Sequence, residues 1–197
     1  MRKFLMTVAL TAVMAVASAQ NEPGTLTIQP KGGFGLATLT NVSEAEMTGV
    51  GMFGGELEYA LKEKLSIGAG INFDMLGYGI NDANSVKDWH TSLNYLAVPV
   101  VANYYIYKGL AVKAGLQPGL LLSANVAYKE DGDKYDTKVT GDYNKFDLSI
   151  PIGLSFEFSH VVIDARYLLG LTKVNKYGDK TCRNSVILIT TGYKFKL

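Results

Sequence analysis

Two histidines and an aspartate are the residues with the most obvious capacity for proton transfer. Asp88 and His90 lie two positions apart, a combination that could serve as a general acid and base, and His160 is the only other histidine. No positioned nucleophile or second acid pair accompanies Asp88 and His90, so a solvated loop explains them better than an active site does. The sequence therefore predicts a protein that is not an enzyme, with no catalytic residues.

A cluster of acids and one cysteine are the candidate metal ligands. The acids lack the order of acids, glycine and terminal glutamate that an EF-hand requires, so an acidic turn in water accounts for them. Cys182 is the only cysteine, which excludes an internal disulfide and a zinc site built from several cysteines. We expect neither a metal site nor a cofactor. The clustered acids are Glu130, Asp131, Asp133 and Asp136.

The N-terminus has the pattern of a secretory signal peptide. Arg2 and Lys3 precede an apolar run from residue 4 to residue 16, and Ala17-Ser18-Ala19 follows as a small-residue cleavage site. The run is too short for a membrane-spanning helix, which needs about 20 residues. The sequence predicts a signal peptide over residues 1–19, cleaved after Ala19, and a single domain over residues 20–197.

The charge of the predicted mature chain is close to zero. The whole chain has 19 basic and 18 acidic residues, and loss of Arg2 and Lys3 changes the formal net charge from +1 to −1. This balance gives no reason to expect a nucleic acid as partner.

The segment from Phe146 to Phe158, FDLSIPIGLSFEF, alternates between apolar residues and small or polar residues. Strict alternation predicts an extended strand, because successive side chains leave a pleated backbone on opposite faces. At about 3.3 Å per residue, such a strand is long enough to cross a bilayer at a tilt.

Seven further segments have the same period of two. A membrane protein built from strands must close into a barrel, since lipid cannot satisfy the polar groups of an open edge. Eight is the smallest common number of strands in such barrels. The predicted fold is all-β, an eight-stranded antiparallel up-and-down transmembrane β-barrel. The predicted strands cover residues 26–38, 48–61, 64–78, 92–107, 110–127, 145–158, 161–172 and 185–197.

The connections between these strands alternate in length. Tight hairpins are predicted at Lys62-Glu63, Lys108-Gly109 and Ser159-His160. The other connections are long and polar, and outer-membrane barrels have short turns toward the periplasm and long loops outside. The long connections cover residues 39–47, 79–91, 128–144 and 173–184.

The polar faces of the strands carry six acids and five bases. The interior of an eight-stranded barrel is just wide enough for side chains to fill it, which disfavours a wide pore. Because unpaired buried charges are costly, we expect these residues to form an ion-paired structural network in the lumen. They are Lys31, Glu56, Glu58, Asp74, Lys113, Asp147, Glu157, Asp164, Arg166, Lys194 and Lys196.

A soluble, lipocalin-like binding barrel is the alternative fold, with the apolar faces inside. Alternation alone does not distinguish the two. Glycine-rich polar faces, alternating loop lengths and the lack of a disulfide favour the membrane barrel. So do the last residues, where Tyr193, Phe195 and Leu197 share one face, as in the C-terminal signal for barrel insertion.

Several short motifs resemble the small outer-membrane β-barrel proteins of Bacteroidota, the PorT-like or "porin family" group. In their order along the chain, they extend this resemblance over essentially the whole predicted mature sequence. Ala97 departs from the pattern, since an acid is expected there in many members. The motifs are Lys31-Gly32-Gly33, Tyr95-Leu96-Ala97-Val98-Pro99-Val100, Ala114-Gly115-Leu116-Gln117-Pro118-Gly119, Asp164-Ala165-Arg166-Tyr167 and Gly170-Leu171-Thr172.

This resemblance implies the outer membrane of a Gram-negative bacterium as the location. The partners we expect for such a barrel are outer-membrane lipid, the barrel-insertion machinery during biogenesis, and an extracellular or envelope protein. Three roles stay open from the sequence: a structural or interacting barrel with exposed loops, a narrow channel, and an accessory role in assembly or secretion.

Overall fold

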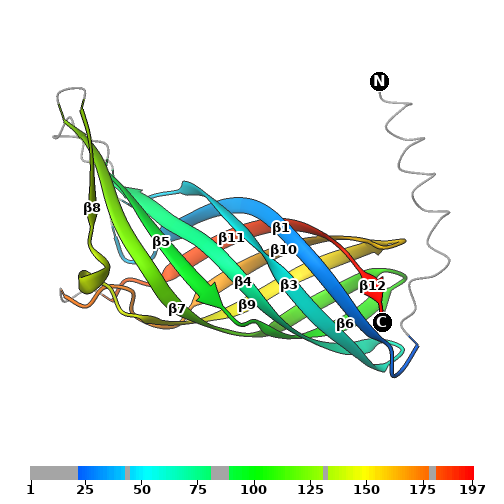
Figure 1. Ribbon diagram of the computed structural model, residues 1–197. Coiled ribbons are helices and arrows are strands. Elements are labelled where there is room, and N and C mark those ends of the chain that lie inside the picture. The colour runs from blue at the N-terminus through cyan, green and yellow to red at the C-terminus, as the bar shows by residue number, and fades with distance from the viewer. Residues whose placement is uncertain (1–21, 43–44, 81–88, 131–132, 178–180) are drawn as a thin grey trace.

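A computed structural model describes residues 22–42, 45–80, 89–130, 133–177 and 181–197. The chain forms one antiparallel sheet that closes on itself (Figure 1). Among the described residues no helix is long and apolar enough to cross a membrane. The elements are β1 (Leu26–Leu39), β2 (Ala45–Glu46), β3 (Thr48–Lys62), β4 (Leu65–Ile80), β5 (Trp89–Ala97), β6 (Val100–Tyr107), β7 (Leu110–Glu130), β8 (Asp133–Lys138), the 3₁₀ helix η1 (Thr140–Asp142), β9 (Phe146–Phe158), β10 (Val161–Gly170), β11 (Asn184–Tyr193) and β12 (Phe195–Lys196).

The barrel closes where β1 pairs with β11. Each wall strand pairs antiparallel with its neighbours in the chain, and the first and last wall positions meet along a ladder from Lys31 opposite Gly192 to Leu39 opposite Asn184. β5 and β6 succeed each other at one wall position, as do β11 and β12, so the barrel wall has eight positions. The predicted all-β, eight-stranded antiparallel barrel is confirmed.

One predicted strand, 92–107, is interrupted. Proline has no N–H to donate to a strand ladder, and Pro99 falls between β5 and β6. The neighbouring strands are still hydrogen-bonded to this segment. The amide of Gly70 donates to the carbonyl of Pro99 (3.0 Å), and the amide of Val98 donates to the carbonyl of Pro118 (2.8 Å). The break therefore leaves the wall continuous.

The first tight turn lies one residue later than predicted. Lys62 still pairs with Leu65, so the turn consists of Glu63 and Lys64, and the register is irregular between Ala60 and Lys62. The other two turns lie where the sequence predicted them, at residues 108–109 and 159–160. We call the end with these three turns the turn end and the opposite end the loop end.

Two of the predicted long loops contain strands. β7 continues to Glu130 and pairs with β8, and this hairpin projects past the rest of the barrel at the loop end (Figure 1). β2 pairs with the end of β4 inside the segment predicted as a loop at 39–47. β8 is polar and β2 has only two residues, so apolar alternation did not reveal either strand.

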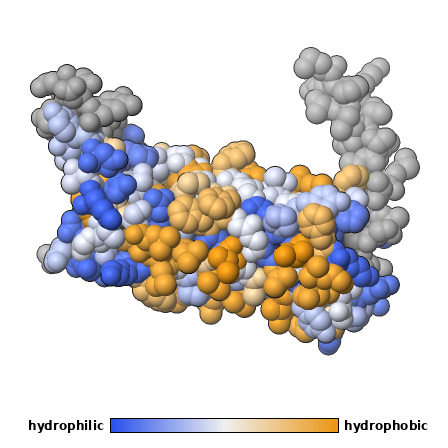
Figure 2. Space-filling view, in the orientation of Figure 1, coloured by the Kyte–Doolittle hydropathy of each residue, from blue (hydrophilic) through white to orange (hydrophobic). Residues whose placement is uncertain are grey.

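The apolar face of each strand points outward. In β9, Phe146, Ile152 and Leu154 are exposed, whereas Asp147 and Glu157 are buried. On the face shown in Figure 2, an apolar band covers the middle of the barrel between more hydrophilic ends. This is the arrangement of a membrane barrel, because a soluble binding barrel would have its apolar faces inside. The lipocalin-like alternative is wrong.

Gly35 is required by the closeness of β1 and β11. A Cβ at this position would overlap the carbonyl oxygen of Ile187 and lie against the backbone of Leu188, whereas a Cβ at Gly49 would meet nothing within 4 Å. We expect Gly35→Ala to destabilise the folded barrel by about 1 to 3 kcal/mol, because the strands that close it must separate.

Urea unfolding of the refolded protein in lipid vesicles measures this loss, and Gly49→Ala is the matched control. Equal unfolding free energies for the two variants would contradict the argument from strand closeness.

Candidate functional site

The lumen near the turn end contains a chain of ion pairs that we call the first ion network. Lys31 of β1 pairs with Glu56 of β3. Lys113 of β7 lies between two carboxylates, with its Nζ 3.4 Å from Glu56 Oε1 and 3.1 Å from Asp164 Oδ2. Arg166 of β10 donates from two nitrogens to the two oxygens of Asp164, at 2.6 and 2.8 Å. Five buried charges are thus joined across four strands.

A second ion network is centred on Lys194, which lies between β11 and β12. Its Nζ is 2.7 Å from Glu157 Oε2 on β9 and 3.1 Å from Glu58 Oε2 on β3. The hydroxyl of Tyr105 on β6 donates to Glu58 at 2.7 Å, and the hydroxyl of Ser66 on β4 donates to the same carboxylate.

The two networks together take side chains from all eight wall positions. The first has a formal charge of +1 and the second of −1, so their charges cancel. Such pairing is required in a narrow lumen, because an isolated buried charge is far more costly than a paired one. The networks thereby connect strands that are distant around the wall.

Two further carboxylates lie inside the barrel without an ion pair to any described residue. Asp74 Oδ2 accepts a hydrogen bond from Gln117 Nε2 at 2.8 Å. Asp147 Oδ1 accepts from Asn184 at 3.1 Å and from Thr172 at 3.2 Å. Both side chains are buried, and the residues that donate hydrogen bonds to them are neutral.

Lys196 does not belong to the lumen, and its predicted place there is wrong. Its side chain is 64 % exposed and lies 3.3 Å from the exposed carboxylate of Glu22. Alternation along the last strand predicts that the side chain of Lys196 points inward, as that of Lys194 does. However, Lys196 lies at the very end of the wall, where the lumen meets water. The other ten predicted lumen residues are buried.

The lumen near the loop end is apolar, a feature that the sequence analysis missed. A cluster of buried side chains from the wall is covered by Tyr143, Val174 and Cys182 from the loops. The hydroxyls of Tyr78 and Tyr143 are hydrogen-bonded at 2.8 Å. The available signal was the stretch of residues 95–102 in the predicted strand 92–107, which is apolar on both faces and includes the end of β5. The wall residues of this loop-end cluster include Met52, Leu76, Leu93, Leu121, Leu168, Val186 and Leu188.

Among the residues with possible proton or metal chemistry, those whose side chains the structure describes are not brought together. His90 Nδ1 lies 3.2 Å from Thr48 Oγ1 near the loop end, and His160 lies in a turn at the opposite end. Asp88 and Asp131 lie outside the described residues. Within the described ranges, no group of three or more His, Cys, Asp or Glu side chains is placed to hold a metal ion.

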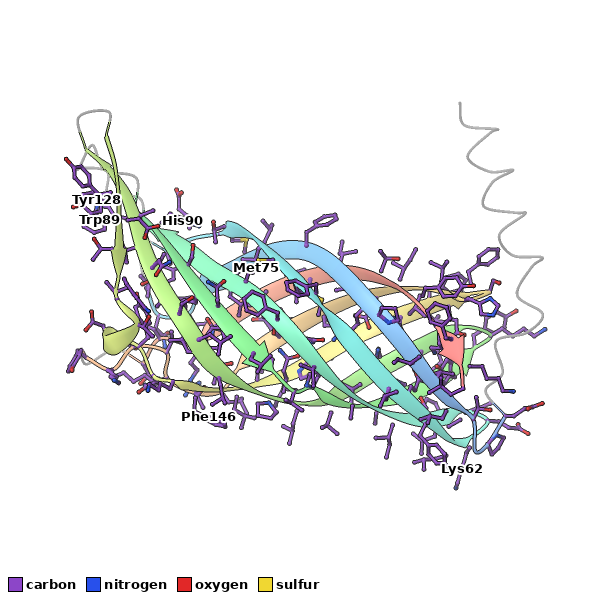
Figure 3. All side chains as sticks on the ribbon, in the orientation of Figure 1. Lys62, Met75, Trp89, His90, Tyr128 and Phe146 are labelled. Carbon is purple, nitrogen blue, oxygen red and sulfur yellow. The ribbon has the colours of Figure 1, made fainter. Side chains whose placement is uncertain are left out.

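Three aromatic rings form a stack on the projecting sheet. Trp89, Tyr128 and Tyr135 face one another in register on β5, β7 and β8. The ring centroids lie 4.9 Å apart for the first pair and 5.2 Å for the second, with nearly parallel planes. Figure 3 shows Trp89 and Tyr128 side by side at the loop end, with Lys62 at the other end. We call this group the aromatic ladder.

A closed barrel with an apolar outer band and a charged, paired interior defines the class of small outer-membrane β-barrel proteins. Residues 18–176 match a known family, described as outer membrane protein beta-barrel domain. The chain belongs to this family. A search of curated proteins finds no match to the sequence.

Solved structures of small barrels have the same fold. The attachment invasion locus protein Ail of Yersinia pestis is 16 % identical with a TM-score of 0.52, and the match covers 88 % of this chain and 99 % of Ail. Neisserial surface protein A is 13 % identical with a TM-score of 0.50, covering 86 % and 97 %. CarO2 of Acinetobacter baumannii is 12 % identical with a TM-score of 0.50, covering 89 % and 100 %.

Removal of one partner from the first ion network should be strongly destabilising. Among the described residues, Arg166→Ala leaves Asp164 with an ion pair to Lys113 alone, and we expect a loss of about 3 to 5 kcal/mol in unfolding free energy. Lys196→Ala removes only an exposed pair and should change stability by less than about 1 kcal/mol.

Urea unfolding in lipid vesicles, with tryptophan fluorescence as the signal, compares the two variants. An Arg166→Ala protein as stable as the parent would show that water screens the lumen charges.

Proposed function

We propose that this protein is a closed, non-catalytic outer-membrane barrel that acts through the surface at its loop end, in a structural or interaction role. The observation that supports this most is the filled lumen. The ion networks occupy the turn-end half, and the loop-end cluster occupies the other half.

A narrow channel would need a continuous path of water through both halves. The first half has charges that are bonded to each other across the lumen, and the second has apolar side chains packed around Leu93, which is fully buried. Water in such a path would have to separate ion pairs and then cross an apolar layer. Both steps argue against conduction.

The projecting hairpin supports a role in contacts with other molecules. Its aromatic ladder combines rigid rings with exposure, since Trp89 is 38 % and Tyr135 is 46 % exposed. Aromatic side chains that are already ordered lose little entropy on binding. An extracellular or envelope protein is the proposed partner of this surface.

Location and processing are part of the same proposal. The loop end would face the outside and the turn end the periplasm, after cleavage behind Ala19 and insertion by the barrel-insertion machinery. The barrel domain would comprise residues 20–197. The PorT-like resemblance of the sequence supports an accessory role in assembly or secretion as the alternative, which a stable complex with envelope proteins would distinguish.

The filled lumen predicts that the purified protein does not conduct ions. In planar bilayers we expect no regular current steps from the wild-type barrel. Steps whose ion selectivity reverses in Lys113→Glu would show that ions pass along the lumen, and the closed-barrel proposal would then be wrong.

The proposed orientation predicts which end is labelled on intact cells. In a Cys182→Ala background, Tyr135→Cys should react with a membrane-impermeant maleimide, because this side chain is exposed at the loop end. Glu63→Cys at the turn end is the matched control and should react only after permeabilisation. The opposite labelling pattern would mean that the barrel is inverted.

A further inference from the structure

A small cavity lies in the lumen at the border of the loop-end cluster. Leu76, Leu168 and Val186 of that cluster form part of its wall. The cavity has room for about one water-sized group. Its remaining lining is mostly polar, with Asp74, Tyr95, Gln117, Asp147, Ser149 and Asn184.

Asp74 is the least satisfied group in this wall. Its side chain is 1 % exposed, and its Oδ2 is bonded to Gln117. The second oxygen, Oδ1, is buried and has no hydrogen-bond partner in the described part of the chain. A buried carboxylate oxygen without a partner is costly, so an occupant of the cavity that supplies positive charge would stabilise the barrel.

The distribution of charge inside the barrel also indicates this cavity. The buried charged side chains are six acids and four bases. The two ion networks use four acids with all four bases, which leaves Asp74 and Asp147 without an ion pair to any described residue; the charges of Arg166 and Lys31 act on Asp74 only from beyond ion-pair distance. Both line the cavity, and they interact electrostatically with each other. The interior therefore has an excess charge of −2, and its two acids without an ion pair lie around one small space.

We propose that this cavity binds one Ca²⁺ ion between Asp74 and Asp147. Two carboxylates, an amide oxygen and hydroxyl oxygens are hard ligands of the type that Ca²⁺ takes, and a divalent ion cancels the excess charge. The space is too small for the retained water shell of Mg²⁺. No cysteine or histidine lines the cavity, which disfavours transition metals.

Binding is tested on the full-length mature barrel, refolded from urea into detergent micelles in EDTA or in Ca²⁺. We expect the thermal unfolding midpoint to rise with Ca²⁺ and to saturate, with no comparable rise in Mg²⁺. Tb³⁺ is the second probe. Its luminescence should be sensitised by Tyr95, which lines the cavity, and should fall when Ca²⁺ displaces it.

Asp74→Asn and, separately, Asp147→Asn should each abolish the Ca²⁺-dependent shift and weaken Tb³⁺ binding at least tenfold. Asp136→Asn is the matched control, because it removes an exposed acid of β8 in the projecting hairpin and should leave both responses unchanged. If one lumen variant does not fold, the other and the wild-type titration still decide the question.

Three results would overturn the site. If the wild-type barrel shows no response to Ca²⁺, the site does not bind the ion. Asp74 and Asp147 would then be protonated or hydrogen-bonded to water instead. A response that persists in both lumen variants would place the ion elsewhere. Loss of the response in Asp136→Asn would place the ion at the projecting hairpin. None of these results bears on conduction, so the closed-barrel proposal is tested separately.

Discussion

The structure depends on one constraint, that charges inside a narrow barrel must be neutralised by other groups inside it. Water is scarce in an eight-stranded lumen, so a lone charge cannot be solvated there. Lys113 illustrates the solution, since it lies between Glu56 and Asp164 and joins β3 to β10 across the lumen. The same interactions that make the charges tolerable also connect the walls, and the barrel is closed by its side chains as well as by its backbone.

The two halves of the lumen stabilise the barrel in different ways. Charges near the turn end connect the strands, whereas the apolar cluster near the loop end excludes water and receives loop residues such as Tyr143 and Val174. This second half gives the loops a place to attach. It also supports the projecting hairpin, because β5 and β7 leave the cluster directly toward Trp89 and Tyr128. The apolar cluster that fills the lumen therefore also supports the strands that form the ordered outer surface.

The sequence predicted the parts of the fold that depend on alternation. In β9 the outward and inward residues are as the period of two indicated, and the buried charges follow from the same rule. Alternation does not tell where the wall ends, so Lys196 was assigned to a lumen that it does not reach. It also does not show which face points inward where both faces are apolar, as in residues 95–102, and it does not reveal a polar strand such as β8. The interruption at Pro99 arises because proline has no N–H for the strand ladder, and apolar alternation does not register this property.

The most direct test of the central claim is a double-mutant cycle on Lys31 and Glu56, which pair between neighbouring strands. Unfolding free energies in lipid vesicles are measured for Lys31→Met, Glu56→Gln and the double variant. Each single change leaves a buried charge with fewer partners, so the account predicts that the double variant loses clearly less stability than the two single losses combined. Losses that simply add would show that the two charges do not depend on each other, and would contradict the account.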